Sequence, residues 1–90
     1  MKRYFITVKG RVQKVGFRAF VMDAAIRFGL KGYTKNLLNG DVFIDVVGDK
    51  DKIDCFIEEV KKGPALAIVK DLVIEEQSDF GSYRDFSIRY

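Results

Sequence analysis

Hydrophobic side chains recur along the chain with two different periods, and each period marks a different kind of element. Every second residue is apolar in the segments that we expect to be strands, because successive side chains of a strand point to opposite faces of a sheet. Apolar residues three and four positions apart mark the segments that we expect to be helices. Strands are predicted at residues 2–9, 31–38, 41–48, 67–76 and 84–90, and helices at residues 17–28 and from Asp49 or Asp51 to Lys62.

Glycine, proline and asparagine mark the ends of these elements. Gly29 ends the first helix, and Gly63-Pro64 ends the second one. Asn39-Gly40 lies between two strands and predicts a two-residue hairpin turn in which both residues take a positive φ. The order of elements predicts an α+β fold, a ferredoxin-like split βαβ sandwich. It consists of βαββαβ plus a C-terminal strand, with an antiparallel sheet and two helices on one face.

Composition limits the chemistry that is open to the chain. Its 90 residues, 48% of them hydrophobic, suffice for a single small domain that spans residues 1–90. Histidine is absent, which removes the usual general base of neutral pH and any metal site that contains histidine. Cys55 is the single cysteine, so a disulfide within the chain and a thiolate metal cluster are excluded. One unpaired cysteine favours a reducing, cytoplasmic setting.

The charges favour small anionic partners over large ones. Sixteen basic and 13 acidic residues give a net charge of +3, but they are scattered along the chain and form no basic block that would indicate nucleic-acid binding. The segment after Met1-Lys2-Arg3 alternates and lacks the unbroken apolar run of a signal peptide, and no segment is apolar over the length of a membrane span. We therefore expect neither a nucleic-acid nor a membrane partner.

The stretch from Gly10 to Arg18 carries the strongest chemical signal. It joins the first strand to the first helix, contains Gly10 and Gly16, and places Arg18 in the first helical turn. The free N–H groups at a helix start, together with a guanidinium, form a site suited to a tetrahedral anion. Taken alone, this spacing also fits a plain connection with an arginine that faces solvent.

Two longer segments resemble the signatures of the acylphosphatase family. Residues 10–18, Gly-Arg-Val-Gln-Lys-Val-Gly-Phe-Arg, are similar to the first signature, G-x-V-Q-G-V-x-F-R. Residues 32–42, Gly-Tyr-Thr-Lys-Asn-Leu-Leu-Asn-Gly-Asp-Val, are similar to the second one, G-[WY]-V-x-N-x-x-[DN]-G-x-V. The resemblance continues through Gly48-Asp49, Gly63-Pro64 and the aromatic C-terminus and covers essentially the whole chain.

The resemblance implies hydrolysis of acyl phosphates to a carboxylate and inorganic phosphate, with no metal and no organic cofactor. Arg18 stands at the position of the family's phosphate-binding arginine, and Asn36 at that of the asparagine that holds the attacking water. The residues whose backbone amides are implied to bind the phosphate are Gln13, Lys14, Val15, Gly16, Phe17 and Arg18. We expect a cytoplasmic monomer that binds a small-molecule acyl phosphate and releases inorganic phosphate.

Lys14 departs from the family pattern, because the signature has glycine there. If the position requires a positive φ, lysine costs roughly 1–2 kcal/mol. If it does not, the ammonium adds positive charge beside the phosphate or points to solvent. Asp41 and Asp45 alternate outward on their strand, and we expect them to be solvated or salt-bridged rather than to act as an acid/base pair.

Two alternatives come from other classes of protein. RNA-recognition motifs share the βαββαβ order, and Val15 to Val21 superficially resembles their ribonucleoprotein-1 string. That string belongs on the third strand, whereas here it straddles a loop and a helix start, and the third strand offers only Phe43 for stacking. A non-catalytic phosphate-binding or regulatory acylphosphatase-like module, as at the N-terminus of hydrogenase-maturation proteins, is the other alternative. Dependence of acyl phosphate hydrolysis on Arg18 distinguishes it from an enzyme.

Overall fold

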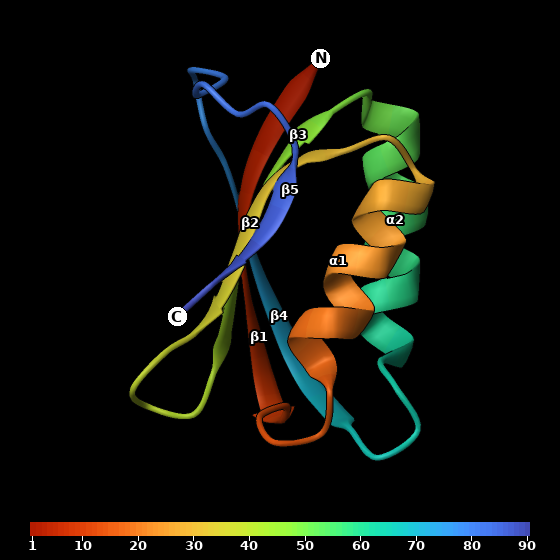
Figure 1. Ribbon diagram of the computed structural model, residues 1–90, viewed down its shortest axis with the longest axis vertical. Helices are drawn as coiled ribbons and strands as arrows, with labels where there is room; N and C mark the ends of the chain where they lie inside the picture. Colours follow the sequence, from red (N-terminus) through yellow and green to blue (C-terminus); the bar gives the residue numbers. More distant parts are fainter.

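Two helices cover one face of a five-stranded sheet in the computed structural model, which describes residues 1–90 (Figure 1). The predicted α+β class and the split βαβ order are confirmed. The elements are β1 (Lys2–Arg11), α1 (Phe17–Arg27), β2 (Lys31–Asn36), β3 (Val42–Gly48), α2 (Lys50–Lys62), β4 (Ile68–Glu76) and β5 (Phe86–Arg89).

The sheet is mixed, so the predicted fully antiparallel sheet is wrong in one strand pair. The strand order is β4-β1-β3-β2-β5, and β5 pairs with β2 in parallel. Both β1 and β2 run antiparallel to β3, and β4 runs antiparallel to β1. After β4 the chain reverses through residues 77–85 and reaches the free edge of β2 on the far side of the sheet (Figure 1). It therefore arrives there in the same direction as β2.

The core lies between the sheet and the helices, where the two apolar periods meet. Alternate residues of β1 and β3 face the helices and are buried, while Phe17 and Val21 of α1 and Phe56 of α2 pack onto them. Each such side chain contributes about 1.5–3 kcal/mol when it leaves water. The fully buried side chains of the two central strands are Ile6, Val8, Val42, Ile44 and Val46.

The connection between β2 and β3 is wider than the predicted two-residue hairpin turn. Gly40 has a φ of 98°, but Asn39 has no positive φ, so the expected turn type is wrong. The side-chain oxygen of Asn39 accepts a hydrogen bond from the N–H of Asp41 at 3.0 Å. Gln13 Nε2 donates to the carbonyl oxygens of Leu37 and Asp41, at 2.8 Å each. These two hydrogen bonds come from Gln13, which lies outside the hairpin, and they hold the loop in a wider conformation.

Asp45 lies on the sheet face opposite the helices, yet it is only 1% exposed. Arg3 binds its carboxylate with two nitrogens, at 2.9 and 2.8 Å, and the Tyr83 hydroxyl donates to it at 2.5 Å. Burial, followed by the hydrogen bond with Asp45, raises the pKa of Tyr83. Asp41 pairs with Lys9 at 2.8 Å. Both aspartates are salt-bridged, as predicted, but the segment after β4 covers Asp45, which a strand pattern does not reveal.

Candidate active site

The end of the sheet at which β1 leads into α1 holds a small cavity of about 190 Å³. It is formed by the β1–α1 loop, the first turn of α1 and the ends of β2 and β5. Its lining residues are Val12, Lys14, Gly16, Phe17, Arg18, Ala19, Asn36, Ile88 and Tyr90. The cavity brings Arg18 and Asn36 together, whereas Gln13 and Val15 do not line it.

The loop begins where Gly10 breaks the register between β1 and β4. A Cβ atom at Gly10 would lie 2.1 Å from the carbonyl oxygen of Ile68, and φ at this position is 128°. Only glycine lets β1 pass β4 this closely. The close approach turns the chain out of the sheet and towards the start of α1.

The backbone N–H groups of residues 13–18 have no hydrogen-bond partner within the protein. No backbone carbonyl accepts a hydrogen bond from any N–H group of residues 13–19, and the first such bond at this helix start runs from Phe20 to Gly16. Lys14 and Gly16 have φ values of 62° and 77°, so left-handed residues interrupt the loop. Left-handed residues that alternate with right-handed ones are typical of anion-binding nests, in which successive N–H groups point to the same side. Lys14 therefore does adopt a positive φ, which is the conformation that glycine favours.

Arg18 places a charged group beside these amides. It lies in the first turn of α1, is half-buried, and forms no ion pair or side-chain hydrogen bond with the rest of the protein. Its Cζ lies 4.7 Å from the ring centroid of Tyr90. Lys14 is exposed and has no ion-pair partner either. Two unpaired cations and a set of free N–H groups make this end of the molecule attractive to a small anion.

Asn36 is the last residue of β2 and contributes the most unusual atom of the site. Alternation along β2 places its side chain on the helix face, together with that of buried Thr34. The Oδ1 atom of Asn36 is buried and has no hydrogen-bond partner, the single such side-chain atom in the protein. Most buried polar atoms in proteins are paired. The exception here belongs to Asn36, which lines the same cavity as Arg18.

Three site residues have roles that sequence reasoning missed. Gln13 is implied by the resemblance to offer its amide N–H, but its side chain also ties the β2–β3 loop, and with it the end of β2, to the 13–18 loop. Ile88 and Tyr90 line the cavity because β5 lies beside β2. The alternation of residues 84–90 shows which face they share, but not which strand they join.

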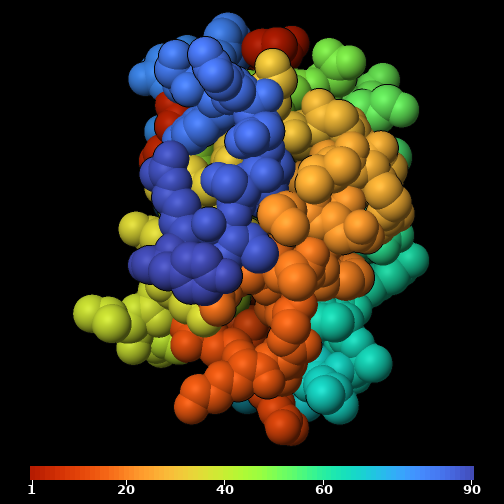
Figure 2. Space-filling view, in the orientation of Figure 1, coloured from red at the N-terminus to blue at the C-terminus, as the bar shows by residue number.

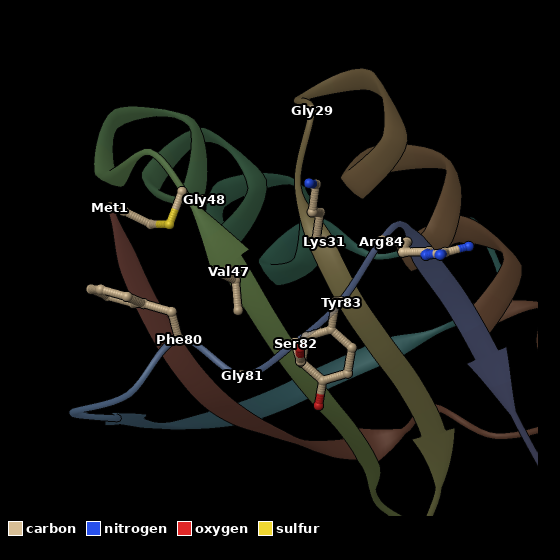
Figure 3. A pocket seen from close by; sticks show the side chains of 10 residues that line it. All are labelled: Met1, Gly29, Lys31, Val47, Gly48, Phe80, Gly81, Ser82, Tyr83 and Arg84. Atoms are coloured by element: carbon tan, nitrogen blue, oxygen red, sulfur yellow. The ribbon is translucent and has the colours of Figure 1, made fainter.

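A larger cavity, of about 350 Å³, lies at the opposite end of the sheet (Figure 3). Met1, Lys31, Phe80, Tyr83 and Arg84 are among its lining residues. The guanidinium of Arg84 points away from the other lining side chains in Figure 3. No buried unpaired polar atom faces this cavity. The smaller cavity is therefore the one that is lined by the residue with an unpaired buried polar atom, Asn36.

Nowhere do three or more aspartate, glutamate, cysteine or histidine side chains gather as a metal site requires. Neither helix has the length and hydrophobicity needed to cross a membrane.

Comparison with known proteins gives one consistent result. The sequence profile of the acylphosphatase family matches residues 4–88. An acylphosphatase of Thermotoga maritima is 44% identical over 90 residues, which are 100% of this chain and 99% of that protein. The crystal structure of acylphosphatase from Bacillus subtilis has a TM-score of 0.97 and 39% identity, with 100% of both chains covered. HypF of T. kodakarensis has a TM-score of 0.87 and 40% identity, but the match covers 100% of this chain and only 12% of HypF.

Proposed function

Since the chain belongs to the acylphosphatase family and hydrolyses acyl phosphates, we propose that Arg18, Asn36 and the 13–18 loop carry out this reaction. The relatives that match over their whole length are acylphosphatases. An enzyme is therefore better supported than a non-catalytic phosphate-binding module. The observation that carries the assignment of residues is that Asn36, whose side-chain oxygen has no hydrogen-bond partner, lines the same cavity as Arg18, whose guanidinium has no ion-pair partner.

The phosphoryl group of the substrate binds against the 13–18 loop. The free N–H groups of Gln13 to Arg18 donate to its oxygens, and the Arg18 guanidinium offers a planar fork of further donors. Since the loop amides are part of the folded backbone before the substrate arrives, they need little reorganisation as charge redistributes in the transition state. The cavity of about 190 Å³ suits a phosphoryl group better than a large acyl group.

Asn36 holds the attacking water. Its side-chain amide, which lines the cavity, forms a hydrogen bond with the water and so sets the position of the water oxygen relative to phosphorus. The hydrogen bonds from Gln13 to the β2–β3 loop fix the end of β2, and so the distance between Asn36 and the bound phosphate. A water placed in this way attacks in line with the bond to the departing acyl oxygen.

The leaving group explains why the site needs no acid. Attack by water forms a new P–O bond, breaks the bond to the acyl oxygen, and yields a carboxylate and inorganic phosphate. The conjugate acid of a carboxylate has a pKa of about 4, so the leaving oxygen departs without being protonated. A loose phosphoryl-transfer transition state asks little of a base, and an oxygen of the substrate's own phosphate takes the proton of the water.

Charge stabilisation and positioning remain as the tasks of the protein. Arg18 and the loop amides neutralise the charge on the phosphoryl oxygens, while Asn36 places the nucleophile. Loss of one such group typically lowers turnover by a factor of about 10²–10³. A phosphomonoester has a far more basic leaving oxygen, so this site hydrolyses it much more slowly.

The test is steady-state hydrolysis of benzoyl phosphate by the wild type, Arg18→Ala and Asn36→Ala, with a chelator present and a phosphomonoester as control substrate. We expect kcat to fall by about 10²–10³ in each variant. Arg11→Ala is the matched control, because Arg11 is an exposed arginine at the end of β1 that does not line the cavity. Far-UV circular dichroism shows whether each variant is folded.

The results separate binding from chemistry. Arg18→Ala should also weaken competitive inhibition by inorganic phosphate, whereas Asn36→Ala should leave that inhibition nearly unchanged, since Asn36 contacts the water. Folded variants that retain wild-type kcat would contradict the assignment of these residues. A loss of activity in Arg11→Ala as large as that in Arg18→Ala would show a general effect of charge.

A further inference from the structure

The aromatic ring of Tyr90 is the one protein group that contacts the Arg18 guanidinium through a specific interaction. The Cζ of Arg18 lies 4.7 Å from the ring centroid, within the range of a cation–π contact. Tyr90 is 98% exposed, so its contacts bury little of the residue and its replacement leaves the core intact. Removing it therefore changes the surroundings of Arg18 and little else.

Parallel pairing of β5 with β2 brings Tyr90 to the site. The pairing of Lys35 with Arg89 ends this ladder, and its continuation sets Tyr90 beside Asn36. On the opposite sheet face, the Cζ of Arg89 lies 3.8 Å from the ring centroid of Tyr33 and holds the end of β5. In Figure 2 the dark-blue C-terminal residues border the orange surface of the start of α1.

A stacked guanidinium keeps its ability to bind phosphate. The Cζ of Arg18 lies over the ring, and the N–H donors are spread around the planar group, so donors remain for an anion. A free arginine side chain must give up much rotamer freedom when it binds an anion, and stacking removes part of that freedom in advance.

We propose that Tyr90 is a positioning residue, whose ring holds the Arg18 guanidinium beside the 13–18 loop before the substrate binds. This inference rests on the proposed role of Arg18 in phosphate binding. An exposed cation–π contact of this kind strengthens phosphate binding by about 2- to 5-fold. The contribution is the same for substrate and transition state, so it acts on KM rather than on kcat.

The test compares Tyr90→Leu, which removes the aromatic ring, with Tyr90→Phe, which keeps it. For each variant we would measure kcat and KM for benzoyl phosphate and the inhibition constant of inorganic phosphate. Tyr90→Leu should raise KM and the inhibition constant by about 2- to 5-fold, while Tyr90→Phe retains the wild-type values. Phe80→Leu is the matched control, since Phe80 is an exposed aromatic residue at the other end of the sheet.

The outcomes distinguish this inference from the proposed function. If Arg18→Ala weakens phosphate inhibition but Tyr90→Leu does not, Tyr90 has no positioning role and this inference alone fails. If Tyr90→Phe is as impaired as Tyr90→Leu, the hydroxyl rather than the ring is responsible, which also overturns it. If Arg18→Ala leaves phosphate inhibition unchanged, the proposed function itself has failed. An unchanged urea midpoint in Tyr90→Leu confirms that the effect is local.

Discussion

Lys14 is the one residue other than glycine with a positive φ, and replacing it with glycine should stabilise the protein. At a φ of 62°, the Cβ atom of a lysine crowds the backbone at a cost of roughly 1–2 kcal/mol. Glycine avoids this cost but makes the unfolded chain more flexible, which takes back about 0.4–1 kcal/mol. The Lys14 side chain is exposed, so its removal sacrifices no packing. The net gain is about 1 kcal/mol, or about 4–8 °C in Tm.

Urea unfolding followed by far-UV circular dichroism measures this gain, since the chain has no tryptophan to report by fluorescence. Lys14→Ala is the matched control, because it removes the same ammonium but keeps the Cβ atom. We expect the free energy of unfolding of Lys14→Ala to stay within about 0.5 kcal/mol of the wild type. Equal stabilities of the two variants would refute the argument from backbone strain.

The activity of Lys14→Gly tests a second part of the same reasoning. The N–H group of residue 14 remains in the loop, so this variant should keep or raise the kcat for benzoyl phosphate. A large loss of activity in both Lys14→Gly and Lys14→Ala would instead show that the ammonium is a functional group. A loss in Lys14→Gly alone would show that the 13–18 loop requires the stiffness that a side chain provides.

Three further predictions concern the sheet. Gly32→Ala should destabilise the fold by about 3 kcal/mol in urea unfolding, because its Cβ would lie 1.8 Å from the carbonyl oxygen of Asp45 at a φ of 133°; wild-type stability would contradict this. Asp45→Ala should cost about 3 kcal/mol by the same assay, since it removes the buried partner of the Arg3 guanidinium, which is 12% exposed, and leaves it only the exposed carboxylate of Asp79; a loss below about 1 kcal/mol would show that Asp79 and water replace the carboxylate of Asp45. Because the pKa of Tyr83 is raised in the folded state, folding favours the neutral phenol over the phenolate. The stability that the phenol contributes is present below pH 10 and is lost as the pH rises through the raised value. Urea midpoints should therefore fall less steeply above pH 10 in Tyr83→Phe than in the wild type, and equal slopes would exclude the effect.

Local patterns were sufficient to predict most of the fold. Each strand and helix buries one face, and the spacing of its apolar residues shows this without reference to any other segment. Examples are Ile6 and Ile44 in the strands and Val21 and Phe56 in the helices. Gly63 ends α2 with a φ of 68°, as expected of a glycine after a helix.

Features that depend on contacts distant in sequence were not predictable in this way. The turn at Asn39 was mistaken because Gln13, in another loop, holds it open. Burial of Asp45 depends on Tyr83, which lies far along the chain. The place of Tyr90 depends on the strand that β5 joins, and a pattern along one segment contains no information about its partner.

The candidate site was likewise predictable from local sequence only in part. An anion-binding loop around Arg18 follows from glycines and a helix start, but the importance of Asn36 came only from resemblance to a family. Its unpaired Oδ1 is visible only in three dimensions. An asparagine at the end of a strand is otherwise typical of an ordinary turn.

The central claim is that the 13–18 loop binds the phosphoryl group and that a water beside Asn36 attacks phosphorus. The most direct test is hydrolysis of benzoyl phosphate by the wild type in isotopically labelled water, with mass spectrometry of both products. The account predicts that the heavy oxygen appears in inorganic phosphate and that benzoate remains unlabelled. Heavy oxygen in the benzoate would mean that water attacks the acyl carbon, and would contradict the account.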